Sequence, residues 1–130
     1  MFIFGHRFLP SKNFYHIFDI DAIFKTPPHA TLFITWEENN LDIIHYMREN
    51  HLNFALEVNT ITELLYAASL GASYIFVPQE LVKTAQSIAE TYLFDAKIIV
   101  FIEEESDIEE MALLGIDGVV FANAIIKITS

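Results

Sequence analysis

Carboxylate and amide side chains follow most of the apolar segments that the sequence predicts as strands. They are Glu37, Asn59, Gln79, Glu103 and Asn123. If these strands run parallel, their carboxyl ends meet at one edge, which is where parallel α/β proteins bind ligands. We therefore predict these five side chains as ligand-binding candidates. A structural explanation competes, because an acidic residue at a helix start is favourable by about 0.3–1 kcal/mol without any ligand.

Glu57 is a separate candidate, because it lies inside the apolar segment 54–58. A charge in such a place costs several kcal/mol unless it is paired. A carboxylate that is kept there nonetheless could serve as a general acid or base. We take Glu57 as a candidate catalytic residue and a purely structural pairing as the alternative.

Other residue types with catalytic or metal-binding potential are present but form no recognisable motif. Five histidines occur, and none pair at metal-ligand spacing, since His45 and His51 fall on different faces of a helix. The acidic run 103–110 suits a solvated loop and a first helical turn, with a calcium site as the alternative. Only four glycines occur, and none forms a phosphate-binding loop. No motif identifies a reaction, so whether the chain is an enzyme stays open.

A repeated unit predicts the architecture. Placing Gly71 on Gly115 aligns Leu64 with Ile108, and an apolar strand follows each glycine. Strands are expected at 31–35, 54–58, 74–77, 97–102 and 118–121, with helices at about 41–50, after Thr60, after Pro78 and after Ser106. Capping boxes at 60–63 and 106–109 start two of these helices, and the two glycines end them. Strand, helix and glycine stop in succession indicate a parallel α/β protein.

Two architectures fit this pattern: a part-barrel resembling half of a (βα) barrel, or an open sheet of the flavodoxin type. A complete eight-stranded barrel usually needs about 250 residues, which the chain does not have. Residues 1–30 form an irregular segment with two possible extra strands, 2–4 and 15–18, and residues 31–122 form the βα repeats. The 130 residues therefore make one α/β domain.

Composition narrows the class of partner. The net charge of −11 disfavours nucleic acid and anionic membranes, which need clustered basic residues. Apolar residues make up 53% of the chain. A small monomer cannot bury so many apolar side chains in its own core, so a homo-oligomer is expected. No apolar run is long enough to cross a membrane. The N-terminus does not resemble a secretory signal, and the lack of cysteine suits a cytoplasmic protein.

The segments 98–102, 108–111 and 114–121 resemble the closing βα unit of phosphate-handling (βα)8 barrels. They are most similar to the end of glycerophosphodiester phosphodiesterases. The resemblance implies that His6, in Gly5-His6-Arg7, is an acid/base catalyst and that Asp19 and Asp21 hold a divalent metal. The chain departs from that family in its short spacing from His6 to Asp19 and in Ala122-Asn123, where the family has an acidic position.

The sequence thus predicts a barrel-like, non-catalytic α/β domain that self-associates and binds a small ligand or a protein partner, with no cofactor. The alternative is a metal-dependent phosphodiester hydrolase that uses Glu57 with Glu37 or Glu103, together with His6 and Asp19, and binds Mg²⁺ or Ca²⁺.

Overall fold

All eight strands of the computed structural model, which describes residues 1–129, run parallel in a single sheet. The strands are β1 (Phe2–Phe4), β2 (Phe14–His16), β3 (Thr31–Thr35), β4 (Phe54–Glu57), β5 (Tyr74–Val77), β6 (Lys97–Phe101), β7 (Gly118–Val120) and β8 (Ile125–Lys127). Their order in the sheet is β1-β7-β6-β5-β4-β3-β2-β8. The five predicted strands of residues 31–122 and the two proposed N-terminal strands are all present.

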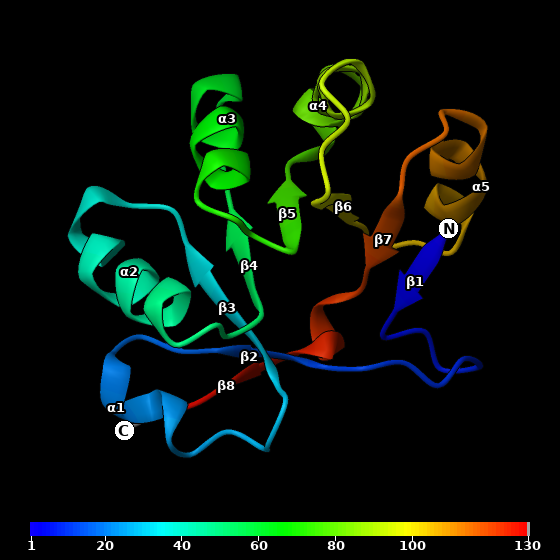
Figure 1. Ribbon diagram of the computed structural model, residues 1–130. Coiled ribbons are helices and arrows are strands. Elements are labelled where there is room, and N and C mark those ends of the chain that lie inside the picture. Colours follow the sequence, from blue (N-terminus) through cyan, green and yellow to red (C-terminus); the bar gives the residue numbers. More distant parts are fainter. Residues whose placement is uncertain (130) are drawn as a thin grey trace.

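Helices connect consecutive strands from β2 to β7 and lie in an arc outside the sheet (Figure 1). They are α1 (Ile20–Ile23), α2 (Leu41–Glu49), α3 (Ile61–Ser69), α4 (Gln79–Thr91) and α5 (Ser106–Leu113). Short 3-10 turns, η1 (Glu38–Asn40) and η2 (Ala122–Ala124), precede α2 and β8. The helix α1 was not predicted from the sequence.

The sheet curls into a half-barrel, and this decides between the two architectures. An open sheet of the flavodoxin type carries helices on both faces. Here the helices pack on one face only, where residues such as Ile44, Leu64 and Val82 meet the outward side chains of the strands. The other face is covered by its own side chains. The predicted α/β fold is therefore confirmed in its half-barrel form.

The inner face is filled with aromatic side chains that come from both ends of the sheet. Its buried residues are Phe4, Phe14, Phe33, Ala55, Phe76, Ile99, Val120 and Ala124. Phe4 of β1 and Phe14 of β2 meet edge to face with ring centroids 4.9 Å apart. Phe14 also meets Phe76 at 5.0 Å. Because the interior is packed, ligand access is confined to the edges of the half-barrel.

Close backbone approach marks the place where the end of β1 lies beside η2. Phe121 donates its backbone N–H to the Phe4 carbonyl at 2.9 Å. Gly5 has a φ of +84°, and a Cβ there would lie 3.0 Å from the Ala124 Cβ. A larger residue at position 5 would therefore be strained and would push η2 away from β1.

Of the two predicted capping boxes, the one at the start of α3 is present and the one at the start of α5 is not. The Thr60 hydroxyl accepts the Glu63 N–H at 3.1 Å, as the first capping box predicts, and the Glu63 carboxylate accepts the N–H of Asn59 at 2.9 Å. The second predicted box, at 106–109, is wrong, because α5 begins at Ser106 itself and has no side-chain cap. There the Asp107 carboxylate accepts the Glu104 N–H at 3.3 Å instead.

Four helices end in the same way. The residues after the C-caps of α2, α3, α4 and α5 are His51, Gly71, Leu93 and Gly115, and all four have φ between +53° and +87°. At each end the next N–H bonds back to the last full turn, for example Ile116 to the Met111 carbonyl at 3.1 Å. These are Schellman motifs, which turn the chain back toward the next strand. Two of the four use glycine, whereas His51 and Leu93 hold a strained backbone conformation.

Substitutions at two of these ends should have opposite effects on stability. Gly115→Ala is expected to lower the free energy of unfolding by about 1 kcal/mol, because a Cβ at positive φ is strained although the space around it is open. His51→Gly should raise the free energy of unfolding by up to about 1 kcal/mol, because glycine removes the strain at positive φ. The gain is reduced by the extra conformational entropy that glycine gives the unfolded chain. Urea denaturation measures both, with His51→Ala as the control that keeps the Cβ. A gain in His51→Ala equal to that in His51→Gly would contradict the strain argument.

Candidate functional site

The parallel sheet places the predicted ligand-binding side chains at one edge. Glu37, Asn59, Gln79, Glu103 and Asn123 all lie two or three residues beyond the carboxyl ends of β3 to β7. Contacts within this edge divide it into two groups of residues, one around His16 and one around His6. Neither group was recognised from the sequence, because each joins segments far apart in the chain.

Glu57, the candidate catalytic residue, is half-buried at the end of β4 and paired across the sheet. The Thr35 hydroxyl donates to its Oε1 at 3.0 Å. Thr35 and Glu57 are also direct register partners on β3 and β4. This contact supplies the polar pairing that a carboxylate at the end of an apolar strand requires.

His16 lies at the same edge on β2, separated from Glu57 on β4 by strand β3. Its ring stacks on Phe18 with centroids 4.2 Å apart and meets Phe33 edge to face at 4.8 Å. A hollow of about 170 Å³ opens beside it, and its polar lining comes from His16, Thr35, Glu37 and Asn40. Asn40 holds the wall in place by donating its side-chain N–H to the Thr35 carbonyl at 2.9 Å.

Burial lowers the pKa of His16 below its ordinary value, and the positive charge of Lys127 lowers it further. Lys127 is the register partner of His16 on β8. At neutral pH His16 is therefore an uncharged imidazole, with one nitrogen that donates and one that accepts. The hollow thus combines a neutral imidazole, a carboxylate and an amide, with an ammonium group nearby.

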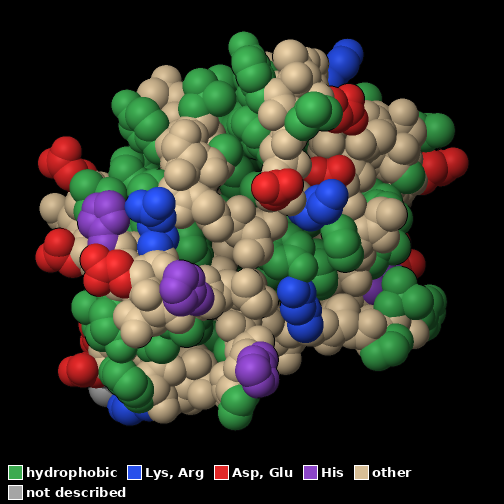
Figure 2. All heavy atoms as spheres, in the orientation of Figure 1, with side chains coloured by type: hydrophobic (Ala, Val, Ile, Leu, Met, Phe, Trp, Pro, Cys, Tyr) green, Lys and Arg blue, Asp and Glu red, His purple; other side chains and the backbone are tan. Residues whose placement is uncertain are grey.

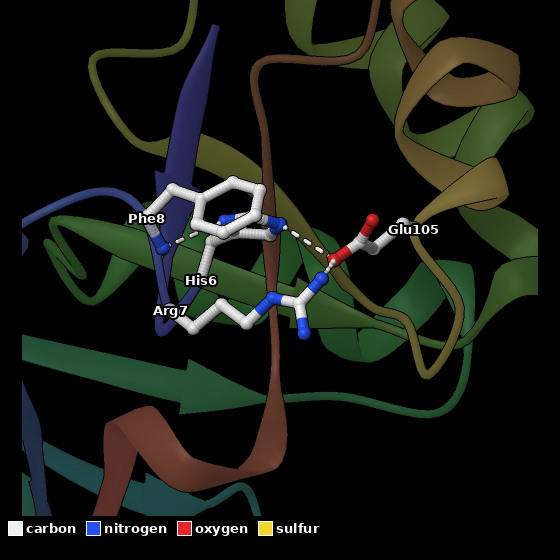
Figure 3. Close-up of polar contacts among 4 residues, drawn as sticks. All are labelled: His6, Arg7, Phe8 and Glu105. Carbon is white, nitrogen blue, oxygen red and sulfur yellow. Dashed lines mark hydrogen bonds and ion pairs between the residues drawn. The ribbon is translucent and has the colours of Figure 1, made fainter.

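The second group joins the loop after β1 to the turn before α5 (Figure 3). His6 Nε2 lies 3.1 Å from Glu105 Oε1, and Arg7 reaches the same oxygen at 3.2 Å. The Phe8 N–H donates to His6 Nδ1 at 3.1 Å, so Nδ1 is an acceptor and Nε2 carries the proton. Only 9% of the His6 side chain is exposed. Both ring nitrogens of this candidate acid/base residue are thus engaged within the protein.

The remaining predicted residues hold the edge together or face solvent. Gln79 donates to the Phe101 carbonyl at 3.2 Å, which ties the start of α4 to the end of β6. Asn59 donates its N–H to Glu63, and the side chains of Glu103 and Asn123 are exposed.

The two residues that the resemblance implies as metal ligands lie at α1. Asp19 caps this helix by accepting the Ala22 N–H at 2.8 Å, and Asp21 is exposed in its first turn. Among residues 1–129, no group of three or more His, Asp or Glu side chains gathers to hold a metal ion. The metal site therefore stays a prediction.

Comparisons with known proteins add no family assignment. No protein-family model and no curated protein sequence matches this chain. Within the described residues, no helix has the length and apolar character to span a bilayer.

Removing the charge of Lys127 should raise the pKa of His16. In Lys127→Met the pKa is expected to rise but to stay below the ordinary value of about 6.5, because burial still disfavours the imidazolium. An NMR titration of the His16 ring measures it, with Lys83→Met on α4 as the control. In the unchanged protein, stability should fall as pH drops below about 6.5, since the unfolded chain then binds the proton more readily. An unchanged pKa in Lys127→Met would contradict the assigned cause.

Proposed function

We propose that this chain is a non-catalytic binding domain that associates with itself and holds a small ligand at the carboxyl edge of its sheet, in the cytoplasm. The observation that carries the self-association is the set of large apolar side chains left exposed. On α3 to α5 and the turns that follow they are Leu65, Tyr66, Tyr92, Leu93, Leu113 and Leu114. Figure 2 shows hydrophobic side chains gathered over this region on the face that it draws.

Self-association explains this surface better than a solvated monomer does. Scattered apolar residues are ordinary on proteins, but Leu65, Tyr92 and Leu93 line one groove between the ends of α3 and α4. A contiguous apolar group of this kind marks an interaction site. A chain of net charge −11 repels its own copies, so a contact has to form where acidic side chains are sparse. Among the described residues, the groove between the ends of α3 and α4 has one charged residue, Asp95, in its lining.

The mass of the protein in solution tests this function. Light scattering should give a mass above the 14.9 kDa of one chain at micromolar concentration. Because burial of apolar surface drives the association, added salt should strengthen it by screening the net negative charge. A mass of one chain up to millimolar concentration would refute the self-association.

The hollow beside His16 supports a ligand-binding role. At about 170 Å³ it is smaller than the pockets of about 300–1,000 Å³ that hold drug-sized molecules. Glu37 suits an ammonium group, Lys127 suits a carboxylate, and the neutral His16 can donate or accept. We infer that the ligand is a small zwitterion of amino-acid type.

The geometry favours this ligand over the metal that the phosphodiesterase resemblance implies. His6 uses both of its nitrogens, and the Asp19 carboxylate caps a helix. A hydrolase of that kind needs a histidine free to exchange a proton and carboxylates free to bind a cation.

Titration of the ¹⁵N-labelled protein tests the ligand and its alternative together. Millimolar glycine should shift the amide signals of His16 and Thr35, and Glu37→Gln should weaken the effect because the ammonium loses its partner. Glu38→Gln, on the neighbouring exposed residue, serves as the control. Mg²⁺ and Ca²⁺ should leave the signals of Asp19 and Glu57 unchanged. Shifts at Asp19 and Glu57 with Mg²⁺, together with hydrolysis of bis(4-nitrophenyl) phosphate, would favour the hydrolase instead.

A further inference from the structure

A groove with a volume of about 460 Å³ runs between the ends of α3 and α4, at the amino edge of the sheet and opposite the candidate ligand site. Its lining includes the small residues Ala68, Ser69, Gly71 and Ala72. Tyr92 and Leu93, on the turn that leaves α4, also line the groove and are strongly exposed. The exposed side chains of Tyr92 and Leu93 therefore project from the surface next to the hollow that the small residues line.

Leu93 is an unusual residue for its position. Its side chain is 84% exposed, and that of Tyr92 is 69% exposed. The backbone of Leu93 has a φ of +53°, a strained conformation that glycine adopts at the equivalent ends of α3 and α5. A single chain gains nothing from a leucine here, because the side chain packs on little and its Cβ adds strain. Strained positions of this kind are concentrated at functional sites.

Charge around the groove points to a second copy of the chain as its occupant. Asp95 is the one charged residue in its lining. On the other side of Gly71 a neighbouring hollow brings in Arg48 from α2. Neither Arg48 nor Asp95 forms an ion pair within the part of the chain that the structure describes. Lys97, close to Asp95 in the sequence, faces a different hollow lined by Met1 and Phe2.

We propose that two copies of this chain pair through a two-fold axis that passes through this groove, between the ends of α3 and α4. A two-fold interface is self-complementary, so each feature on one side of the axis meets its complement from the other copy. Tyr92 and Leu93 of each copy fill the groove of the other copy. The same rotation exchanges the two sides of the groove and brings Arg48 of each copy to Asp95 of the other. This proposal rests on the self-association proposed above and assigns it a surface.

Analytical ultracentrifugation of the full chain and four single variants tests the surface. Leu93→Glu removes the projection, and Ser69→Trp fills the groove; both positions are exposed, so the fold is expected to persist. Each should weaken the dimer at least about 30-fold, the effect of losing an interface hot spot. Phe24→Glu changes an exposed aromatic residue outside the groove and should leave the dimer unchanged. Circular dichroism confirms folding of each variant, and Leu9→Glu, at another exposed apolar residue outside the groove, is a second control that should leave the dimer unchanged.

A charge exchange tests the two-fold axis separately. Arg48→Asp and Asp95→Arg should each weaken association, because each puts like charges opposite one another, and the double variant should recover it. If Leu93→Glu weakens the dimer but the double variant does not recover association, the two-fold arrangement is wrong. A wild-type dimer that survives both Leu93→Glu and Ser69→Trp would overturn the surface and leave self-association standing. Equal weakening by Phe24→Glu would also overturn it, and a wild-type monomer would overturn both proposals.

Discussion

The aromatic interior of the curled sheet is the constraint on which the rest of the molecule depends. Strands β1 and β2 follow each other in the chain, yet they lie far apart in the order of the sheet. Their side chains Phe4 and Phe14 nevertheless meet inside, and both also contact Tyr74 of β5. Edge-to-face aromatic pairs of this kind add about 0.5–1.5 kcal/mol each beyond the area that they bury. They hold the two ends of the sheet near each other, which fixes the curl.

The curl decides where chemistry is possible. Because bulky rings fill the inside, polar side chains that point inward can be accommodated only at the ends of the strands. The Thr35–Glu57 pair and the His16–Lys127 pair both follow this rule, since each lies in the last register position of its strands. At the opposite end, the Lys12 ammonium lies 4.4 Å from the centre of the Tyr74 ring, a cation–π contact that covers the inner core.

The fold could be predicted in large part because short local residue patterns mark each strand and helix of its repeat. Gly71 and Gly115 indicate two helix ends, and apolar runs indicate the strands that the helices connect. The same turn ends α2 and α4 with His51 and Leu93, where nothing local signals a positive φ. The capping box predicted at the start of α5 was wrong because a different local hydrogen bond forms there. Ser106 and Glu109 have the spacing of a capping box, but Asp107 binds the preceding backbone and takes over that role.

The candidate site could be predicted in position but not in its contacts. Parallel strands fix the edge on which Glu37 and Glu57 lie, so those placements follow from the pattern alone. The partners of His6 and His16 do not, because Glu105 and Lys127 are 99 and 111 positions away in the chain (105 − 6 and 127 − 16). A similar long-range link was missed at Gln86, a buried side chain on α4 that accepts the Asp117 N–H at 2.9 Å. Asp117 in turn accepts the N–H of Ile98 and so joins β7 to β6.

The carboxyl and amino edges of the sheet carry different kinds of side chain, which suit ligand binding at one edge and self-association at the other. At the carboxyl edge, half-buried polar side chains such as Thr35 and Glu57 are bonded to each other beside exposed carboxylates, which suits recognition of a small polar molecule. At the amino edge, the helix ends expose apolar side chains, and a strained leucine stands beside a groove. A dimer formed through the amino edge would leave the carboxyl edge of both copies open. Self-association therefore need not compete with ligand binding, because the parallel sheet puts the two surfaces at opposite ends of every strand.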